Sequence, residues 1–547
     1  MRLTQISSTC CFGMLVCFLA AQGWTDNPAG EAPGLTFAKR DAQRASEAAQ
    51  ASTNLVADAA AKLQVAEKAI ADATAAKGIT EKTVADALAA LQAAETAKTA
   101  ADKVSADAAT NAQKVKDDAA ADQAAKDKAQ QDATTAQTTA AAAAEVLKTR
   151  QAEKITADAN QVNTVKALEL AQVALKPAQG AKTEAEKNLA PIAAIAKSAQ
   201  EKAAFYATTP PVATPEAVRL IQTFTHTRPF QSCRIDPTGD FVFGGCQDNT
   251  IQRWDLVLAK QVPLPGHRSW VADFAFQPGT NLLLSAAYEG KLLWWEAPLV
   301  TPTTVRTVAA HKGQVRSIAC SPDGQFVASA GNDKVVRIWR TTDGALLKEL
   351  AGHNSHIYHV AFHPNGKHLV TGELLGIMKQ WEVASWQHVR DFDAKPLHKY
   401  DPTFHADCGG IRGLAFSPDG RFLAAGGIGE VTNAFAGIGK PTVLIFDWLT
   451  GQRVHLLNPK SNFQGSVWAL QFHPTQDFLI GAGGGGSGGL WFWNAETGTA
   501  LFDFPLPAAA YDMSLHPDGL RLALACYDNT LKIYDLGPKP PAAVPPK

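Results

Sequence analysis

Two patterns of apolar and polar positions divide this chain. Beyond residue 216, one unit recurs seven times: an apolar run, a Pro turn, a second apolar run, an Asp- or Gly-containing turn and an aromatic-ended run. The turn prolines are Pro237, Pro278, Pro322, Pro364, Pro418, Pro474 and Pro517. Their spacings are 41, 44, 42, 54, 56 and 43 residues. A period of this size in a β-type pattern predicts one sheet per repeat, with the sheets arranged around an axis.

The third repeat shows the unit most clearly. Its strands are predicted at 315–320, 326–330, 335–339 and 345–350, with a Ser-Pro-Asp-Gly turn after the first and a Gly-Asn-Asp-Lys turn after the second. The seventh repeat stops at Gly537 without a fourth strand, whereas residues 218–224 form an unattached strand ahead of the first repeat.

The other pattern, from residue 37 to 206, is helical. Between Asp41 and Gln200, 55 of 160 residues are Ala, the strongest helix former, and no aromatic residue lies between Phe37 and Phe205. Such a segment lacks the large side chains of an ordinary core. Lys77-Gly78 followed by Thr80 predicts a helix end and a new N-cap. Two interpretations stay open: a coiled-coil stalk or oligomerisation arm, and a low-complexity helical spacer.

The repeats resemble WD-repeat β-propellers, on the Gly352-His353 opening, the Ser-Pro-Asp-Gly turn and the Trp254-Asp255 close, of which the other repeats carry variants. The resemblance covers 216–537 and implies an all-β, seven-bladed WD40-like propeller preceded by the long Ala-rich helical or coiled-coil segment. It also implies that 218–224 completes the last blade and closes the ring. The exported arrangement, with an Ala- and Lys-rich segment before the repeats, resembles proteins of planctomycete-like bacteria.

One set of residues in the third blade could be mistaken for a catalytic triad: His311, Ser329, Asp333 and Trp339. The resemblance implies instead a buried structural tetrad that orders the blade. Equivalent positions recur in the fourth blade, with Leu375 where Asp is expected, and a nucleophile site would not be distributed over several blades. We therefore predict no catalytic residues, no cofactor and no metal site. His363, His473 and His516 are interpreted as turn residues rather than metal ligands.

The two long intervals place extra residues at 392–410 and 428–441, around blades four to six. A glycine run at 483–489 is expected to be a flexible connection in the sixth blade. Loops added to a rigid scaffold often carry binding function. By the resemblance, the residues that begin the first strands face the same side, and aromatic and Arg side chains are favoured interface anchors. The candidate partner-binding residues are Trp270, Gln314, His356, Tyr358, Arg412, Trp468 and Tyr511.

Composition narrows the function classes. The net charge of −1 argues against a nucleic-acid binder. Arg2 followed by an apolar run and a small-residue site at Ala21-Gln22-Gly23 indicates a secretory signal, with an uncleaved anchor as the alternative, and no other segment could cross a membrane. Five cysteines remain after cleavage, without a CxxC or CxxCH motif; buried thiols and a bridged pair are both open. The expected segments are a signal peptide 1–23, a linker 24–36, the Ala-rich helical region 37–206, a Pro-rich linker 207–215, the propeller 216–537 and a Pro-rich tail 538–547.

The sequence therefore predicts a periplasmic, secreted or cell-surface scaffold that binds protein partners and is not an enzyme. A homo-oligomer could form through the helical arm. Two other classes stay open. One is an accessory role in a periplasmic redox or c-type cytochrome system, or a hydrolase-like propeller enzyme. The other is a structural protein of the cell envelope.

Overall fold

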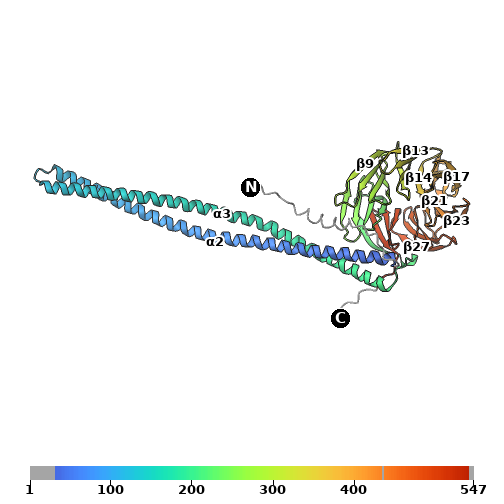
Figure 1. Cartoon of the computed structure of the whole chain (residues 1–547), viewed down its shortest axis with the longest axis horizontal. Helices are drawn as coiled ribbons and strands as arrows, with labels where there is room; N and C mark the ends of the chain where they lie inside the picture. The colour runs from blue at the N-terminus through green and yellow to red at the C-terminus, as the bar shows by residue number, and fades with distance from the viewer. Residues whose placement is uncertain (1–30, 434–436, 541–547) are drawn as a thin grey trace. The chain divides into compact units, whose positions relative to one another are not determined.

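The computed structural model describes residues 31–433 and 437–540. Seven four-stranded antiparallel sheets follow one another along the chain and form the seven-bladed propeller that the repeat predicts (Figure 1). The expected signal peptide and residues 541–547 of the expected tail lie outside the described residues. Among the helices that the structure describes, none combines the length and the apolar character needed to cross a membrane.

The first four blades each run from an inner to an outer strand in chain order. Blade one contains β2 (Phe230–Ile235), β3 (Phe241–Cys246), β4 (Ile251–Asp255) and β5 (Gln261–Leu264). Blade two contains β6 (Val271–Phe276), β7 (Leu282–Ala287), β8 (Lys291–Glu296) and β9 (Thr304–Ala309). Blade three contains β10 (Val315–Cys320), β11 (Phe326–Gly331), β12 (Val336–Arg340) and β13 (Leu346–Leu350). Blade four contains β14 (Ile357–Phe362), β15 (His368–Glu373), β16 (Ile377–Glu382) and β17 (His388–Asp393).

The remaining blades carry the irregularities. A short 3-10 helix, η2 (Lys395–Leu397), and a hairpin of β18 (His398–Asp401) and β19 (Ala406–Gly409) precede blade five. Blade five contains β20 (Gly413–Phe416), β21 (Phe422–Asn433), β22 (Ile438–Asp447) and β23 (Arg453–Leu457). Blade six contains β24 (Ser466–Phe472), β25 (Phe478–Gly484), β26 (Gly488–Asn494) and β27 (Ala500–Leu506). Blade seven contains β28 (Ala510–Leu515), β29 (Arg521–Cys526), β30 (Thr530–Asp535) and, from the other end of the repeats, β1 (Arg219–Thr225), which follows a 3-10 helix η1 (Pro215–Ala217).

The ring is closed by β1, which pairs antiparallel with β30, from Arg219 opposite Asp535 to Thr225 opposite Thr530. The closure expected for residues 218–224 is therefore confirmed. Phe224 of this strand is buried and stacks on Trp254 of blade one, with ring centroids 5.1 Å apart. The closing strand thus joins the last blade to the first by hydrogen bonds on one side and by apolar packing on the other.

The apolar core lies between neighbouring blades. In one cluster, Phe241 and Phe243 of blade one pack against Phe274 and Trp295 of blade two. The largest fully buried side chains include Trp294, Trp295, Trp491 and Trp493. The second and third strands of each blade are largely buried on both faces because neighbouring blades cover them, which explains why their apolar runs show little alternation with polar residues. The outer strands, such as β13, are mostly exposed.

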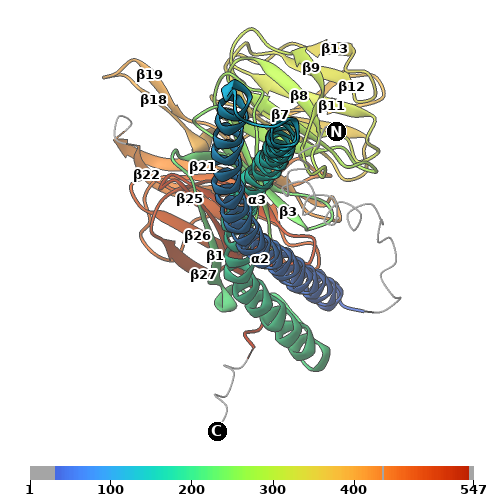
Figure 2. The same cartoon turned by 90° about the vertical axis from the view of Figure 1, so that its left-hand side faces the viewer.

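The helical segment is two helices, α2 (Pro33–Asp117) and α3 (Gln123–Thr208), which run side by side over residues 46–194 (Figures 1 and 2). The side chains of Thr80 and Thr164 hydrogen bond across them at 2.9 Å. The expected break at Gly78 is wrong, since α2 continues through it; one Gly costs a long helix only about 1 kcal/mol. The chain reverses instead at residues 118–122, where Asp122 Oδ1 caps the new helix by accepting from the Ala125 N–H.

The ends of both helices belong to the compact unit that contains the propeller, residues 31–45 and 195–540 of the described chain. Arg44 forms ion pairs with Asp240 and Asp255 of blade one, at 2.8 and 2.6 Å. Asp41 pairs with Arg521 of blade seven at 2.9 Å. These contacts connect the two blades that meet at the ring closure, so the helical ends reinforce the seam that β1 closes.

Candidate functional site

The candidate site is built by a bulge repeated at the start of each blade's first strand. The seven first strands contact one another around the ring and therefore line its axis. In six blades the pairing of the first and second strands shifts by one residue, which leaves one residue unpaired. In blade five Arg412 stands at the equivalent position, and its N–H donates to Gly426 O. Bulges re-aim a side chain. The seven residues are Gln231, Ala272, Arg316, Tyr358, Arg412, Trp468 and Tyr511.

Five of these residues, with three neighbours, form a chain of aromatic and Arg contacts that we call the mouth ring. It consists of Trp270, Tyr288, Arg316, Tyr358, Arg412, Trp468, Tyr511 and Tyr527. Trp270 and Tyr288 are 5.8 Å apart between ring centroids, and the Arg316 guanidinium lies 4.8 Å from Tyr288 and 5.1 Å from Tyr358. The Arg412 guanidinium lies 3.9 Å from Tyr358 and 5.2 Å from Trp468. The mouth ring thus links blades two to seven in one continuous surface.

The remaining two candidate residues, Gln314 and His356, lie beside this ring without belonging to it. Gln314 Oε1 accepts from Asn332 Nδ2 at 3.0 Å, and Asn332 Oδ1 accepts from Arg316 Nε at 3.0 Å, so Gln314 positions Arg316 through Asn332. Burial lowers the pKa of His356, and the nearby positive charges of Arg316 and Lys334 lower it further. His356 therefore lies beside a positively charged sector.

Three members of the mouth ring were not indicated by the sequence pattern: Tyr288, Arg316 and Tyr527. Gln314 was expected in place of Arg316. The reason is that the bulge, which leaves Arg316 unpaired between Val315 and Ser317, cannot be seen in the sequence. One signal could have identified Arg316. It occupies the same position in blade three that Tyr358 occupies in blade four, and Arg412, Trp468 and Tyr511 occupy in the next three blades. Tyr288 and Tyr527 follow second strands, and their approach to the axis required the fold.

The two insertions of blades four to six lie beside the same end of the blades. The extra residues at 428–441 lengthen β21 and β22 beyond Gly426, the partner of Arg412. The β18–β19 hairpin leads into β20 and packs on this extension, where Lys399 Nζ donates to Val431 O at 2.6 Å. Figure 2 shows the hairpin standing out from the blades, and Tyr400 and Phe404 are 51% and 55% exposed on it.

The expected flexible connection at 483–489 is wrong for most of its length. Gly483 pairs with Gly489 and Gly484 with Gly488, so only residues 485–487 form the turn between β25 and β26. Side chains larger than hydrogen would collide here: a Cβ on Gly483 would lie 2.0 Å from Ser466 O. The glycines permit close packing of strands rather than motion.

The structure brings the four residues of the third-blade tetrad together. His311 Nδ1 lies 2.8 Å from Asp333 Oδ1, His311 Nε2 lies 2.7 Å from Ser329 Oγ, and Trp339 Nε1 donates to Ser329 Oγ at 2.8 Å. Burial acts to raise the pKa of Asp333, but hydrogen bonds from His311 and Arg337 outweigh it and hold that pKa below its ordinary range. All the polar groups of the set are engaged with one another inside the blade.

Two further blades contain the same arrangement with Glu in place of Asp. In blade two His267 contacts Glu289 and Ser285, at 3.0 and 2.7 Å, a set that the sequence pattern did not single out. In blade four His353 contacts Glu373 at 2.8 Å and Thr371 at 2.6 Å. The Asp expected at Leu375 is thus replaced by a longer carboxylate two residues earlier, which reaches the same imidazole.

The three turn histidines lie in separate blades and hydrogen bond to neighbouring turns. His363 Nε2 contacts Gly420 O at 2.9 Å, His473 Nε2 contacts Gly519 O at 2.7 Å, and His516 Nε2 contacts Gly239 O at 2.9 Å. Each of these glycines belongs to the turn of the next blade around the ring. The three histidines therefore link neighbouring blades by hydrogen bonds.

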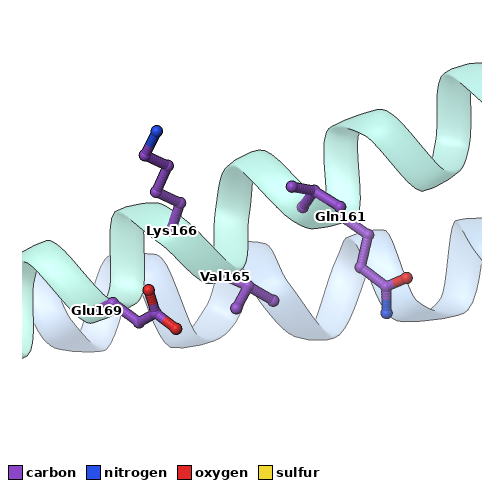
Figure 3. Close-up of a pocket in the computed structure, with 5 residues that line it drawn as sticks. Gln161, Val165, Lys166 and Glu169 are labelled. Atoms are coloured by element: carbon purple, nitrogen blue, oxygen red, sulfur yellow. The ribbon is translucent and has the colours of Figure 1, made fainter.

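A side-chain cluster in blade one and a pocket on α3 lie outside the mouth ring. His226, Cys246 and Asp248 of blade one have potential ligand atoms within 4.8 Å of one another, but Asp248 already accepts from Thr250 and contacts His226 at 2.7 Å, as in the tetrads. A shallow pocket on α3, lined by residues 161–169, is formed by one helix and contains no convergent polar groups (Figure 3). The five described cysteines are free thiols, and burial raises the pKa of Cys320 to about 12 and that of Cys526 to about 11.

Comparison with protein families matches the repeats to the WD40 model, described as WD domain, G-beta repeat. The matched segments are residues 218–255, 259–296, 302–340, 344–382, 395–429 and 507–535. These segments fall on blades one to five and seven. The sixth blade, with its glycine-rich second and third strands, is not among them, although its four strands pair as in the others.

Curated relatives share parts of the propeller. The human kinesin-like protein KIF21B is 34% identical over 109 residues, which cover 19% of this chain and 6% of that protein. A p21-activated protein kinase-interacting protein 1-like protein of Danio rerio is 32% identical over 124 residues, 22% of this chain and 33% of that protein. Protein hir1 of Schizosaccharomyces pombe is 24% identical over 339 residues, 56% of this chain and 30% of that protein. The chain therefore spans at most a third of the length of these relatives.

Proposed function

Because the propeller of this chain carries the WD40 repeat, we propose that the protein is a non-enzymatic scaffold that binds a protein partner at the mouth ring. The observation that carries the proposal is the ring itself, in which Trp, Tyr and Arg side chains from six blades form one surface. These three residue types dominate the binding energy of protein interfaces. A rigid propeller with elaborated loops beside the ring supplies a preorganised surface.

The partially buried state of the ring supports the same proposal. Trp270 is 40% exposed and Tyr527 57% exposed, whereas the other members are partly covered by their neighbours. Side chains already ordered by mutual stacking lose little conformational freedom when a partner binds. The hydrogen-bonded tetrads order the blades on which these side chains stand.

We also propose that the protein acts outside the cytoplasm, in the periplasm or at the cell surface, after cleavage of the signal at residue 23. The Ala-rich helices then serve as a coiled-coil stalk that displays the propeller. The apolar run after Arg2 and the small-residue site at Ala21-Gln22-Gly23 support this proposal. The expected likeness to planctomycete-like proteins is not among the comparisons, whose relatives described above are animal and fungal proteins. N-terminal sequencing of the mature protein should begin at Trp24; an intact Met1 would contradict export with cleavage.

The partner proposal is tested by photo-crosslinking from the cell-envelope fraction, with the full chain as bait. The variant Trp468→Ala removes an anchor between Arg412 and Tyr511 and should reduce recovery of the partner about tenfold or more, the loss expected of a hot-spot residue. The matched control is Leu449→Ala, since Leu449 is 87% exposed and lies outside the ring. The same partners at the same yield from Trp468→Ala would refute the role of the mouth ring.

No arrangement among the described residues favours the alternatives of a redox accessory, a propeller enzyme or a purely structural envelope protein.

A further inference from the structure

The mouth ring contains an unbalanced positive charge. Tyr358 stands between Arg316 and Arg412, whose guanidinium groups lie 5.1 and 3.9 Å from its ring. The N–H groups of Arg316 donate to two neutral oxygens, Asn332 Oδ1 and Tyr288 OH, at 3.0 and 2.8 Å. Within residues 31–433 and 437–540, no carboxylate lies at ion-pair distance from either guanidinium.

The groups that the structure describes around Arg412 and Arg316 do not supply a negative charge that balances the two guanidinium groups. Burial lowers the pKa of Arg412, and repulsion from Arg316 acts in the same direction, with the Tyr358 side chain as its main favourable partner. Arginines of folded proteins that are removed from water are normally paired with an acid, because an unpaired buried charge is costly. Two guanidinium groups in one sector without an acid therefore indicate a place for an anion that the chain does not supply.

The imbalance is confined to the mouth. One residue beyond Ala272 and Tyr511 on the same strands, Asp273 and Asp512 face Arg234, and Arg234 pairs with Asp273 at 3.3 Å. Burial raises the pKa of Asp512 to about 6. The positive charge of Arg234 is thus balanced by Asp273 and Asp512. We therefore expect an anion to bind at the mouth ring and not beside Arg234.

We propose that the mouth ring binds an acidic peptide segment of the partner, with a side-chain carboxylate placed between Arg316 and Arg412. This inference rests on the proposed function and specifies the chemistry of the partner. Guanidinium and carboxylate groups form short, charge-assisted hydrogen bonds whose geometry favours Arg. Trp468 and Tyr358 offer flat apolar surface to the residues beside the acid. The exposed Tyr400 and Phe404 of the β18–β19 hairpin supply further contact area for an extended segment.

The first experiment uses the full chain and fluorescein-labelled dodecapeptides of Gly and Ser with a central block. One peptide has Leu-Glu-Glu-Leu in the block, its twin has Leu-Gln-Gln-Leu, and a third has Leu-Lys-Lys-Leu. Fluorescence anisotropy should show the Glu peptide binding about tenfold or more tightly than the Gln twin, a difference of about 1.4 kcal/mol. The preference should shrink as salt is raised, because Arg316 and Arg412 are only partly buried and salt screens their attraction for the peptide. Equal affinity for the Glu and Gln peptides would overturn the proposal, and so would the absence of binding by all three.

Variants locate the site. Arg412→Gln should abolish the preference for the Glu peptide and Arg316→Gln should reduce it, while Arg340→Gln, on an exposed arginine that pairs with Asp343, should leave it unchanged. The charge swap Arg412→Glu should instead prefer the Lys peptide, which a variant that merely unfolds would not do. Unaltered preference in Arg412→Gln would overturn the assignment.

Two competitors separate the peptide from other anions. Sodium acetate at the ionic strength of a sodium chloride control should not displace the peptide further than the chloride does. A single-stranded oligonucleotide of twelve thymidines should bind more weakly than the Glu peptide. Full displacement by acetate, or tighter binding of the oligonucleotide, would overturn the peptide as ligand. If the Gln or Lys peptide binds better than the Glu peptide and Trp468→Ala weakens it, the scaffold function stands and only the acidic preference fails.

Discussion

At the scale of single residues, most of the His, Ser, Asp and Trp side chains that could suggest catalysis stabilise the propeller instead. His311, Ser329 and Trp339 form a hydrogen-bonded set with Asp333 inside the blade. The proposed binding surface uses a different set of residues, five of which differ from blade to blade at one equivalent position of the first strand. The residues that recur in several blades, such as the tetrads, thus stabilise the blade. The residues that differ between blades at the equivalent first-strand position are the ones we propose to contact a partner.

Ser329→Ala tests the tetrad. The substitution removes the shared partner of His311 Nε2 and Trp339 Nε1 inside the blade, and an unsatisfied buried group costs about 1–3 kcal/mol. We expect the free energy of unfolding, from urea titration followed by Trp fluorescence, to fall by about that amount. Ser487→Ala, in the exposed turn of blade six, is the control and should change it by less than about 0.5 kcal/mol. Equal effects of both substitutions would remove the structural role of the tetrad.

One turn histidine, His473, makes stability depend on pH. His473 Nδ1 accepts from the Gln476 N–H at 3.0 Å while Nε2 contacts Gly519 O, so the ring is neutral in the fold. Burial lowers the pKa of His473 below its ordinary 6.5. The unfolded chain then binds a proton more readily, so this contribution is complete above pH 6.5 and is lost as pH falls below it toward the folded pKa.

The measurement is urea unfolding at pH 7.5 and 5.5. The native chain should lose stability on acidification, and His473→Gln should lose less. Gln is the suitable replacement because Gln277 already contacts the next turn from blade two, with Nε2 3.4 Å from Gly324 O. An identical loss in the native chain and in His473→Gln would assign the pH dependence to other groups.

At the scale of elements, β1 decides whether the ring stays closed. Phe224→Ala keeps the pairing with β30 but removes the stacking on Trp254, and deleting a buried Phe side chain costs about 3–5 kcal/mol. We expect a loss of that size in chemical denaturation, together with faster proteolysis at the closure. Leu449→Ala on the exposed surface should have almost no effect. A loss below about 1 kcal/mol for Phe224→Ala would show that the helical ends alone hold the seam.

The β18–β19 hairpin is the element that can be shortened without harm to the core. Phe392 and Leu397 are fully buried, so the expected insertion at 392–410 is in part core, and only residues 399–408 should be replaced by a short Gly-Ser link. We expect unchanged thermal unfolding and weaker retention of the crosslinked partner. Unchanged retention would exclude the hairpin from the binding surface.

At the scale of the whole molecule, the chain has two units with different sources of stability. The propeller buries many large aromatic and aliphatic side chains, whereas residues 46–194 bury mainly Ala, which gives little apolar area per residue. Eleven of the twelve Trp lie beyond residue 220, so Trp fluorescence reports the propeller, while circular dichroism at 222 nm mainly reports the helices. On heating, the helical signal should be lost before the Trp signal. Coincident transitions would indicate one cooperative unit.

The helical unit also tests the proposed stalk. Light scattering on a fragment of residues 24–206 should give the mass of an oligomer if the helices associate, and the mass of one chain if they act as a spacer. A monomer with partial helicity would refute the coiled-coil oligomer, without bearing on the mouth ring.

The sequence by itself determined the number of blades, the positions of their strands and the closing strand, because each of these follows from a local pattern of apolar runs and turns repeated seven times. It also identified five members of the mouth ring, through their common place at the start of a first strand. It placed a helix end at Gly78 that is absent from α2, since a single Gly is a weak breaker. It gave no sign of the reversal at residues 118–122, because the cap at Asp122 is a single residue in a uniform segment. Only the tertiary structure decided that Arg316, Tyr288 and Tyr527 complete the ring and that two guanidinium groups meet there without an acid. Contacts between blades depend on bulges and on side chains far apart in the chain, which no local pattern records.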